Sequence, residues 1–193
     1  RPRRELRVVV RTAEWEAVCF NAPEVEVVDQ PAVDGDGVVG RTAATAHLGP
    51  DLATPDPDVE LCVARFAVLD PDTTVAEALL DQRVCCGVGN VFKSEVCWAR
   101  RLDPFTPVAA VDEDERRALV ETAALQLRAN LHTSKRTTVP GGLAVYGHTG
   151  RPCRRCGAIV RSKVHGRHAR RTYWCPGCQL APAEPGAAQT SDQ

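Results

Sequence analysis

Methionine is missing from the whole sequence of 193 residues, and so is a secretory signal peptide. Without an initiating methionine, the sequence is expected to be a fragment or a processed product that opens within a strand. A bilayer span needs about 20 consecutive apolar residues, and no apolar run here is long enough. These absences predict a protein of the reducing cytoplasm that has no membrane partner.

Cysteine is abundant instead, with nine residues, but the missing signal peptide argues against a secreted disulfide scaffold. Four cysteines form two Cys-x-x-Cys pairs separated by 18 residues: Cys153, Cys156, Cys175 and Cys178. This spacing is typical of one tetrahedral Zn²⁺ site built from two short turns. Because four thiolates complete the coordination shell, we expect a structural zinc with no open position for catalysis. The other five lie among apolar residues and are expected to act as small hydrophobes: Cys19, Cys62, Cys85, Cys86 and Cys97.

Acidic residues are absent between Cys153 and Cys178, although the whole chain has a net charge of only −1. Five basic residues lie between the two cysteine pairs: Arg161, Lys163, Arg167, Arg170 and Arg171. A metal-stapled hairpin that presents only positive charge favours contact with nucleic acid. His165 belongs to the same segment and is expected at the surface near phosphate, since four thiolates leave no ligand position for it.

The periodicity changes along the chain from strands to helices, which predicts an α+β fold. Three short β-branched or alternating segments predict strands of an antiparallel sheet: 6–11, 14–20 and 25–28. The segment 48–52 and the prolines after it are interpreted as a linker. Four segments with helical periodicity predict helices: 59–68, 75–82, 91–101 and 112 to about 130. The tail after Leu180 is rich in Ala, Pro and Gly and is expected to be disordered.

A glycine-rich turn, Gly87-Val-Gly-Asn90, separates two of the predicted helices. Gly87 and Gly89 permit a tight turn, and Asn90 is expected to cap the following helix. The free N–H groups at that helix start would form an anion site, to which Lys93 adds a mobile positive charge. Taken alone, this pattern is more often a plain helix junction.

Three groups of residues, in this order, carry a resemblance to a known family. The first group is the junction Leu48–Leu52. The second consists of Leu79–Gln82, Gly87–Asn90 and Lys93–Glu95. The third is the ending from Val145 to Gln179, which includes Arg-x-Thr-Tyr-Trp-Cys-Pro-Gly-Cys-Gln. Over about residues 6–180 the sequence resembles the formamidopyrimidine-DNA glycosylase/endonuclease VIII family, with its helix-two-turn-helix and C-terminal zinc finger. The ending looks closest to the endonuclease VIII branch.

The resemblance implies an architecture of three parts and a tail. Residues 1–54 would be the closing strands of an N-terminal antiparallel β-sandwich, and 55–138 the helix-two-turn-helix domain. Residues 139–180 would form a Cys₄ zinc-finger β-hairpin, followed by the disordered tail at 181–193. The implied protein is a bacterial, nucleoid-associated monomer.

The resemblance also implies a base-excision DNA glycosylase and abasic-site lyase acting on double-stranded DNA with an oxidised base or an abasic site. In the family an N-terminal proline, followed by a glutamate, attacks the sugar, and β,δ-elimination then cuts the strand after base flipping. Here Pro2 stands between Arg1 and Arg3 and is not assigned as the nucleophile. This chain is therefore expected to bind damaged DNA but to lack glycosylase activity.

By motif position, Asn90 would bind a phosphate next to the lesion, with Gly87, Gly89 and Lys93 around it. Arg170 matches the zinc-finger arginine that holds phosphate and is the proton donor for δ-elimination. Without the resemblance, Arg170 is a solvated arginine and Asn90 a simple cap.

Other interpretations stay open. The chain could be a stand-alone binding module derived from that enzyme, or a ribosomal or transcription-associated zinc-ribbon protein, and hence a non-catalytic DNA- or RNA-binding protein. Glu95 is interpreted as a structural helix residue. Core packing, rather than base stacking, is expected of the tryptophans: Trp15, Trp98 and Trp174.

Overall fold

A computed structural model describes residues 5–22, 25, 45–167 and 169–181 of the chain. The chain divides into two compact units, Arg1–His47 and Leu48–Gln193, and each is described by itself. Apart from Val25, the predicted strand at 25–28 lies outside the described residues, as does the predicted tail after residue 181.

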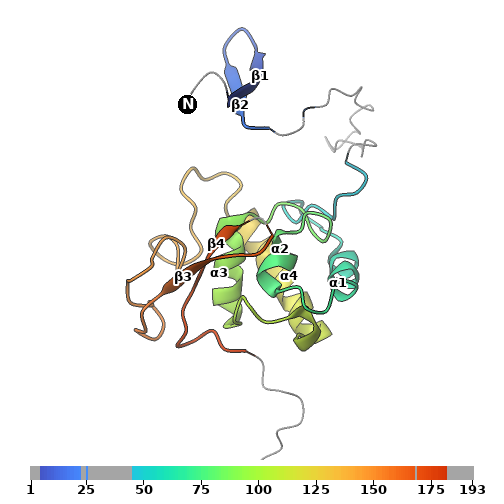
Figure 1. Cartoon of the computed structure of the whole chain (residues 1–193). Helices are drawn as coiled ribbons and strands as arrows, with labels where there is room; N and C mark the ends of the chain where they lie inside the picture. The colour runs from blue at the N-terminus through green and yellow to red at the C-terminus, as the bar shows by residue number, and fades with distance from the viewer. Residues whose placement is uncertain (1–4, 23–24, 26–44, 168, 182–193) are drawn as a thin grey trace, which may run out of the picture. The chain divides into compact units, whose positions relative to one another are not determined.

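In the first unit, β1 (Leu6–Arg11) and β2 (Glu16–Phe20) pair antiparallel, with Val9 opposite Val18 (Figure 1). The turn between them is closed by the hydrogen bond from the Thr12 N–H to the Trp15 carbonyl, at 2.9 Å. Four of the five β2 residues are exposed. Trp15 is 77% exposed and Cys19 is exposed, so neither packs in a core as predicted.

The described residues of the second unit form four α-helices, each within a few residues of its predicted range. They are α1 (Val59–Ala67), α2 (Val75–Leu80), α3 (Asn90–Arg100) and α4 (Glu113–Arg128), with a 3₁₀ turn, η2, at Val108–Ala110. Capping side chains fix three of the starts, because Asp58, Thr74 and Asp112 each accept a hydrogen bond from a first-turn N–H. None of the described helices is both long and apolar enough to cross a membrane.

One apolar core joins these helices. Phe66 from α1, Leu79 from α2, Val96 from α3 and Leu119 from α4 are all fully buried in it. Burying side chains of this size stabilises a fold by about 1.5–3 kcal/mol each relative to exposure. Cys62, Cys85 and Cys97 are buried in the same core, which confirms their predicted role as small hydrophobes, whereas Cys86 is only partly buried.

The interpretation of 48–52 as a linker is wrong, because this segment packs within the helical unit. Gly49 N–H donates to the Gln82 carbonyl at 2.7 Å, and Pro50 O accepts from Cys86 N–H at 2.8 Å. Leu52 is fully buried. The proline-rich composition suggested a linker, but the backbone of this segment forms hydrogen bonds with the turn that precedes α3, more than 30 residues away in the sequence.

The chain ends in a β-hairpin of β3 (Arg161–His165) and β4 (Arg170–Trp174), in which Lys163 lies opposite Thr172. A second, smaller apolar cluster under this hairpin includes Val145 and Val160. Strand β4 contacts α3, which attaches the hairpin to the helical core. Helices and separate antiparallel strands confirm the α+β class.

Trp98 packs against the smaller apolar cluster as predicted, whereas the ring contact found for Trp174 is with Phe105. These two rings meet edge-on with centroids 4.9 Å apart.

Candidate nucleic-acid interface and metal site

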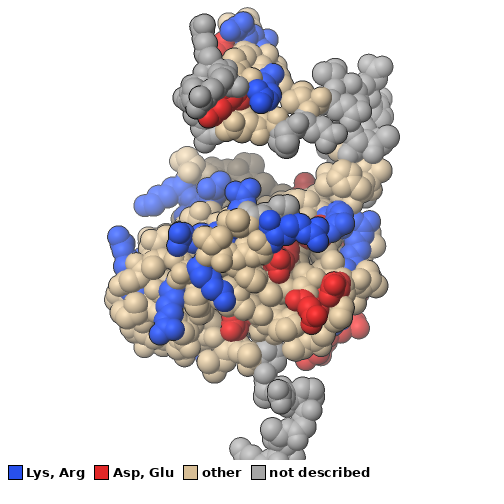
Figure 2. Space-filling view, in the orientation of Figure 1, with Lys and Arg blue, Asp and Glu red and all other residues tan. Residues whose placement is uncertain are grey.

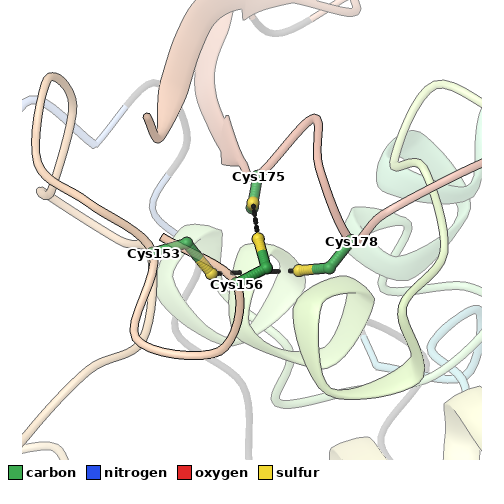
Figure 3. Close-up of side chains that lie close together, drawn as sticks. All are labelled: Cys153, Cys156, Cys175 and Cys178. Atoms are coloured by element: carbon green, nitrogen blue, oxygen red, sulfur yellow. Dashed lines mark hydrogen bonds between the residues drawn. The ribbon is translucent and has the colours of Figure 1, made fainter. Parts of the chain in front are cut away.

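Four cysteine sulfurs converge at the base of the hairpin, from two turns far apart in sequence (Figure 3). All four Sγ atoms lie within 4.8 Å of one another. Cys153 Sγ lies 3.8 Å from Cys178 Sγ, and Cys156 Sγ lies 3.4 Å from Cys175 Sγ. A tetrahedron with metal–sulfur bonds of about 2.3 Å has sulfurs about 3.8 Å apart, so the four residues fit a tetrahedral metal ion.

The backbone holds each pair of cysteines in a tight turn. Cys153 N–H donates to Ala158 O at 2.8 Å, and Gln179 N–H donates to Cys175 O at 3.0 Å. A Cβ at Gly177 would lie 2.7 Å from Ala158 Cβ, so only glycine lets the two turns approach this closely. The Trp98 indole N–H also donates to Cys153 Sγ at 3.4 Å, the kind of outer contact that orients a metal ligand.

The glycine turn before α3 borders an open pocket of about 470 Å³. Seven residues line it: Leu80, Gln82, Gly87, Val88, Gly89, Asn90 and Arg170. The first N–H groups of an α-helix have no partner within the helix, and the helix dipole adds positive potential there. The structure therefore brings the start of α3 together with Arg170, eighty residues away in sequence, around one cavity suited to an anion.

Gln82 holds the glycine turn in place. Its Nε2 donates to the Leu80 and Val88 carbonyls at 3.2 and 3.1 Å, and its Oε1 accepts from Gly87 N–H at 3.1 Å. Gly87 has a φ of +97°, a conformation that favours glycine, and Leu127 leaves little room for a side chain there. The turn is therefore preorganised by groups within the chain.

Asn90 does not cap α3, so that prediction is wrong. Gly89 is the N-cap, without a side-chain cap, and Asn90 is the first residue of the helix. Its Nδ2 instead donates to the carbonyl of Arg171 on β4 at 3.1 Å. The residue thus ties the glycine turn to the hairpin while still lining the pocket.

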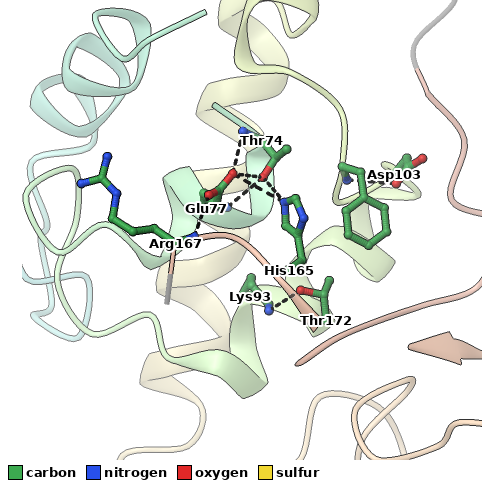
Figure 4. A network of polar contacts seen from close by, with 8 residues as sticks. Thr74, Glu77, Lys93, Asp103, His165, Arg167 and Thr172 are labelled. Carbon is green, nitrogen blue, oxygen red and sulfur yellow. Dashed lines mark hydrogen bonds and ion pairs between the residues drawn. The ribbon is translucent and has the colours of Figure 1, made fainter. Parts of the chain in front are cut away.

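Lys93 is not a mobile surface charge, which corrects its predicted role as a direct DNA contact. The residue is fully buried, with Nζ 2.8 Å from Asn90 Oδ1. The Lys93 Nζ also lies 2.7 Å from Thr172 Oγ1 (Figure 4). The pKa of Lys93 is lowered from 10.5 to about 8, chiefly because the group is buried; an ionised Cys97 would oppose this shift, and nearby Arg170 adds to it. The Lys93 ammonium packs against strand β4, which lies far away in the sequence, so the helical periodicity around Lys93 does not indicate this contact.

Arg170 is exposed at the start of β4, opposite His165, and its side chain lines the pocket. Among its neighbours, Lys163 packs its ammonium over the Phe105 ring at 3.6 Å, and Arg171 donates to Ser162 Oγ at 3.3 Å. Figure 2 shows Lys and Arg side chains spread over the part of this unit where β3 and β4 lie, while acidic side chains gather toward α1 and α4. The face around the pocket is therefore electropositive.

Glu95 is buried and structural, as predicted. Its carboxylate accepts hydrogen bonds from the backbone N–H groups of Ala144, Val145 and Tyr146 at 2.7–2.9 Å, and from the Thr138 hydroxyl. These bonds fasten the segment that leads into the cysteine turns onto α3.

A second contact between the hairpin and the helices was missed by the sequence analysis. His165 Nε2 lies 2.9 Å from the Thr74 hydroxyl and 3.5 Å from Glu77 Oε2, and Arg167 N–H donates to Glu77 Oε1 (Figure 4). His165 is thus part-buried at the start of α2. The capping-box spacing of Thr74 and Glu77 was a readable signal, but nothing in it indicates a histidine ninety residues away.

Comparison with known proteins places this arrangement in context. The model of the formamidopyrimidine-DNA glycosylase H2TH domain matches residues 48–140. The chain is 40% identical over 191 residues to "Probable endonuclease 8 2" of Streptomyces coelicolor, covering 94% of the chain and 64% of that protein. It is 39% identical over 181 residues to "DNA-(apurinic or apyrimidinic site) lyase Nei2" of Mycolicibacterium smegmatis, covering 91% of the chain and 67% of that protein.

Solved structures give the same result for the fold. A complex of the Lactococcus lactis Fpg with DNA containing an abasic site superposes with a TM-score of 0.58 at 27% identity. The match covers 69% of the chain and 52% of that structure. The chain thus spans about two thirds of the length of the two relatives above.

Proposed function

The chain belongs to the formamidopyrimidine-DNA glycosylase/endonuclease VIII family, and we propose that it serves base-excision repair by holding duplex DNA that contains an oxidised base or an abasic site. Its part in that process is to bind the strand next to the lesion, in the bacterial cytoplasm at the nucleoid, as a monomer. Residues 55–138 supply the helix-two-turn-helix and residues 139–180 the finger.

The observation that carries the proposal is the single pocket shared by the start of α3 and Arg170. Both were matched to phosphate contacts of the family on sequence alone. A phosphate in this pocket would meet the N–H groups at Gly89 and Asn90 together with the Arg170 guanidinium, a charge-assisted arrangement. Arg170 would also donate the proton in δ-elimination where a complete enzyme cuts the strand.

We propose that the four cysteines hold one Zn²⁺. The ion would supply folding energy rather than chemistry, because four thiolates leave it no open position. The cysteine turns would then fix β4, and through it Arg170, against α3.

Binding is tested with a fluorescent duplex that contains one abasic-site analogue, using Arg170→Ala and the wild type. We expect the variant to lose roughly 1–3 kcal/mol of binding free energy, the scale of one charge-assisted hydrogen bond to phosphate. Arg154→Ala is the matched control, since Arg154 is an exposed arginine of the same finger that does not line the pocket. Equal affinity of Arg170→Ala and wild type at low salt would contradict the proposal.

Reaction with the lesion is tested by borohydride trapping on the same duplex. The family resemblance assigns the nucleophile to an N-terminal proline followed by glutamate, so we expect no covalent adduct from the 193-residue chain. An adduct would show that an amine within these residues attacks the sugar. Equal affinity for undamaged duplex and for RNA would favour the alternative of a non-catalytic nucleic-acid-binding protein.

A further inference from the structure

Lys93 is a buried cation without an anionic partner among the described residues. Its ammonium donates to the Asn90 side chain, to the Thr172 hydroxyl and, at 3.5 Å, to the Arg171 carbonyl. All three acceptors are neutral, and no described carboxylate forms an ion pair with it. Burying a charge in this way is costly unless an opposite charge compensates it.

The elements packed around Lys93 do not supply that opposite charge. On α3 itself, Cys97 acts on the pKa of Lys93, but burial raises the pKa of its thiol to about 12, so it carries no charge near neutral pH. The Glu95 carboxylate on the same helix is bonded to the backbone N–H groups of residues 144–146. Strand β4 contributes the positive charge of Arg170. Three carboxylates from helices that contact α3 bond elsewhere: Glu77 to Thr74, Asp81 to Arg83 and Glu115 to Arg100.

The place of Lys93 explains what could compensate it. Asn90 lines the open pocket, and its side-chain oxygen accepts a hydrogen bond from the Lys93 ammonium. Arg170 also lines the pocket, and it precedes the two β4 residues that Lys93 contacts. An anion in the pocket would therefore lie one side chain away from the buried ammonium. The positive helix start adds to the same field.

We propose that Lys93 is a positioning residue and the buried counter-charge for a DNA phosphate bound between the start of α3 and Arg170, an inference that rests on the proposed function. It acts through Asn90 and β4 rather than by touching the phosphate. In the free protein the ammonium fixes the two sides of the pocket relative to each other, because it bonds to both Asn90 and Thr172.

A proton linkage follows from this placement. The phosphate charge favours the charged form of Lys93, so binding raises its pKa above the free value of about 8. Above pH 8 the complex must therefore take up a proton that the free protein lacks. By linkage, affinity falls as the pH rises through 8, by up to about tenfold between pH 7 and pH 9.

The test is isothermal titration of the zinc-loaded chain with a duplex that contains an abasic-site analogue, at pH 8.5 in buffers of different ionisation enthalpy. The wild type is expected to take up roughly three quarters of a proton for each duplex bound, because Lys93 with a pKa of about 8 is already about one quarter protonated at pH 8.5. Lys93→Met assigns the proton, because it keeps the volume and removes the charge.

The variants separate this role from a purely structural one. Lys93→Met is expected to bind about tenfold more weakly at pH 7, with no proton uptake and no loss of zinc or thermal stability. Lys163→Met, an exposed lysine of the finger, is the control and should keep the wild-type proton count. The wild-type proton count tests the proposal by itself if Lys93→Met does not fold.

Three results would overturn the inference. Wild-type binding without proton uptake at pH 8.5 would leave the proposed function standing and remove the role of Lys93, as would proton uptake retained in Lys93→Met. Failure of the wild type to bind duplex DNA at all would overturn both.

Discussion

Lys93 and Glu95 are two residues apart on α3, both are fully buried, and they differ in how their charges are met. Glu95 accepts hydrogen bonds from three backbone N–H groups and one hydroxyl, so its lone pairs are satisfied within the chain. Lys93 has hydrogen bonds to neutral oxygens only. Two equally buried residues therefore have different roles. The charge of Glu95 is satisfied by hydrogen bonds within the chain, whereas the charge of Lys93 is left to be compensated by a ligand.

The helix itself separates the two sides. Residues two positions apart on an α-helix point about 200° apart, so Lys93 and Glu95 face opposite directions. Glu95 meets the segment entering the cysteine turns, whereas Lys93 meets β4 beside the pocket. Helix α3 is thus fastened to the finger on one side and arranged for an anion on the other.

Loss of the metal should destabilise the chain most, because it unfolds the finger, which both Lys93 and Glu95 contact. Structural zinc sites bind with about 10–16 kcal/mol, much of which is folding energy. Cys175→Ser, or chelation, is expected to release one zinc and unfold the hairpin, measured by metal content and near-ultraviolet circular dichroism. A folded hairpin without bound metal would refute the zinc assignment.

The Glu95 side should be the more sensitive of the two to substitution. Glu95→Ala leaves three backbone N–H groups without their acceptor and is expected to destabilise the chain by roughly 3–5 kcal/mol in urea unfolding. Glu95→Gln is the milder companion, because it keeps one oxygen for the N–H groups. If Lys93→Met lost as much stability as Glu95→Ala, the distinction between the two residues would fail.

The pH dependence of the free energy of unfolding should show the cost of burying the Lys93 charge. The pKa of Lys93 in the folded chain is about 8, below its ordinary 10.5, because the group is buried. Between pH 8 and pH 10.5 the unfolded chain binds more protons than the folded chain, so the free energy of unfolding rises with pH. The destabilisation caused by burying the charged lysine is fully present below pH 8. The rise is on the order of 3 kcal/mol and should be missing from Lys93→Met in denaturant titrations at pH 7 and pH 10.

The smallest effect is expected at the other end of the hairpin, where Glu77 supports the start of α2. Burial raises the pKa of Glu77, but the Thr74 hydroxyl and the N–H groups of Arg167 and Thr74 overcome this and hold the pKa below 4.5. The Glu77 contribution is therefore present above pH 4.5 and lost as the pH falls through the lowered value.

Removing the Thr74 cap tests that end directly. Thr74→Ala should cost about 1 kcal/mol in thermal unfolding, the usual value of an N-cap. Thr74→Ser is the control, since it keeps the hydroxyl. A loss as large as that of Glu95→Ala would show that the α2 contact, and not α3, is the main attachment of the hairpin.

Local patterns in the sequence predicted the helices and the grouping of the four cysteines. Capping residues such as Asp112 mark helix starts because they bond to N–H groups three positions on, and Cys-x-x-Cys pairs encode a turn. The ordered motifs from Leu48 to Gln179 carried the family, which the comparisons confirm. Within the second unit, the interpretations that failed include those of Asn90, Lys93 and the segment 48–52, whose partners lie far away in the chain.

The sequence by itself determined the elements, the set of cysteines that can hold a metal, and the basic character of the finger, because each depends on neighbours within a few positions. Only the tertiary structure decided that Arg170 meets the start of α3 and that Lys93 lies buried between them. Burial and the pairing of charges depend on contacts across some eighty residues, and no local pattern records them.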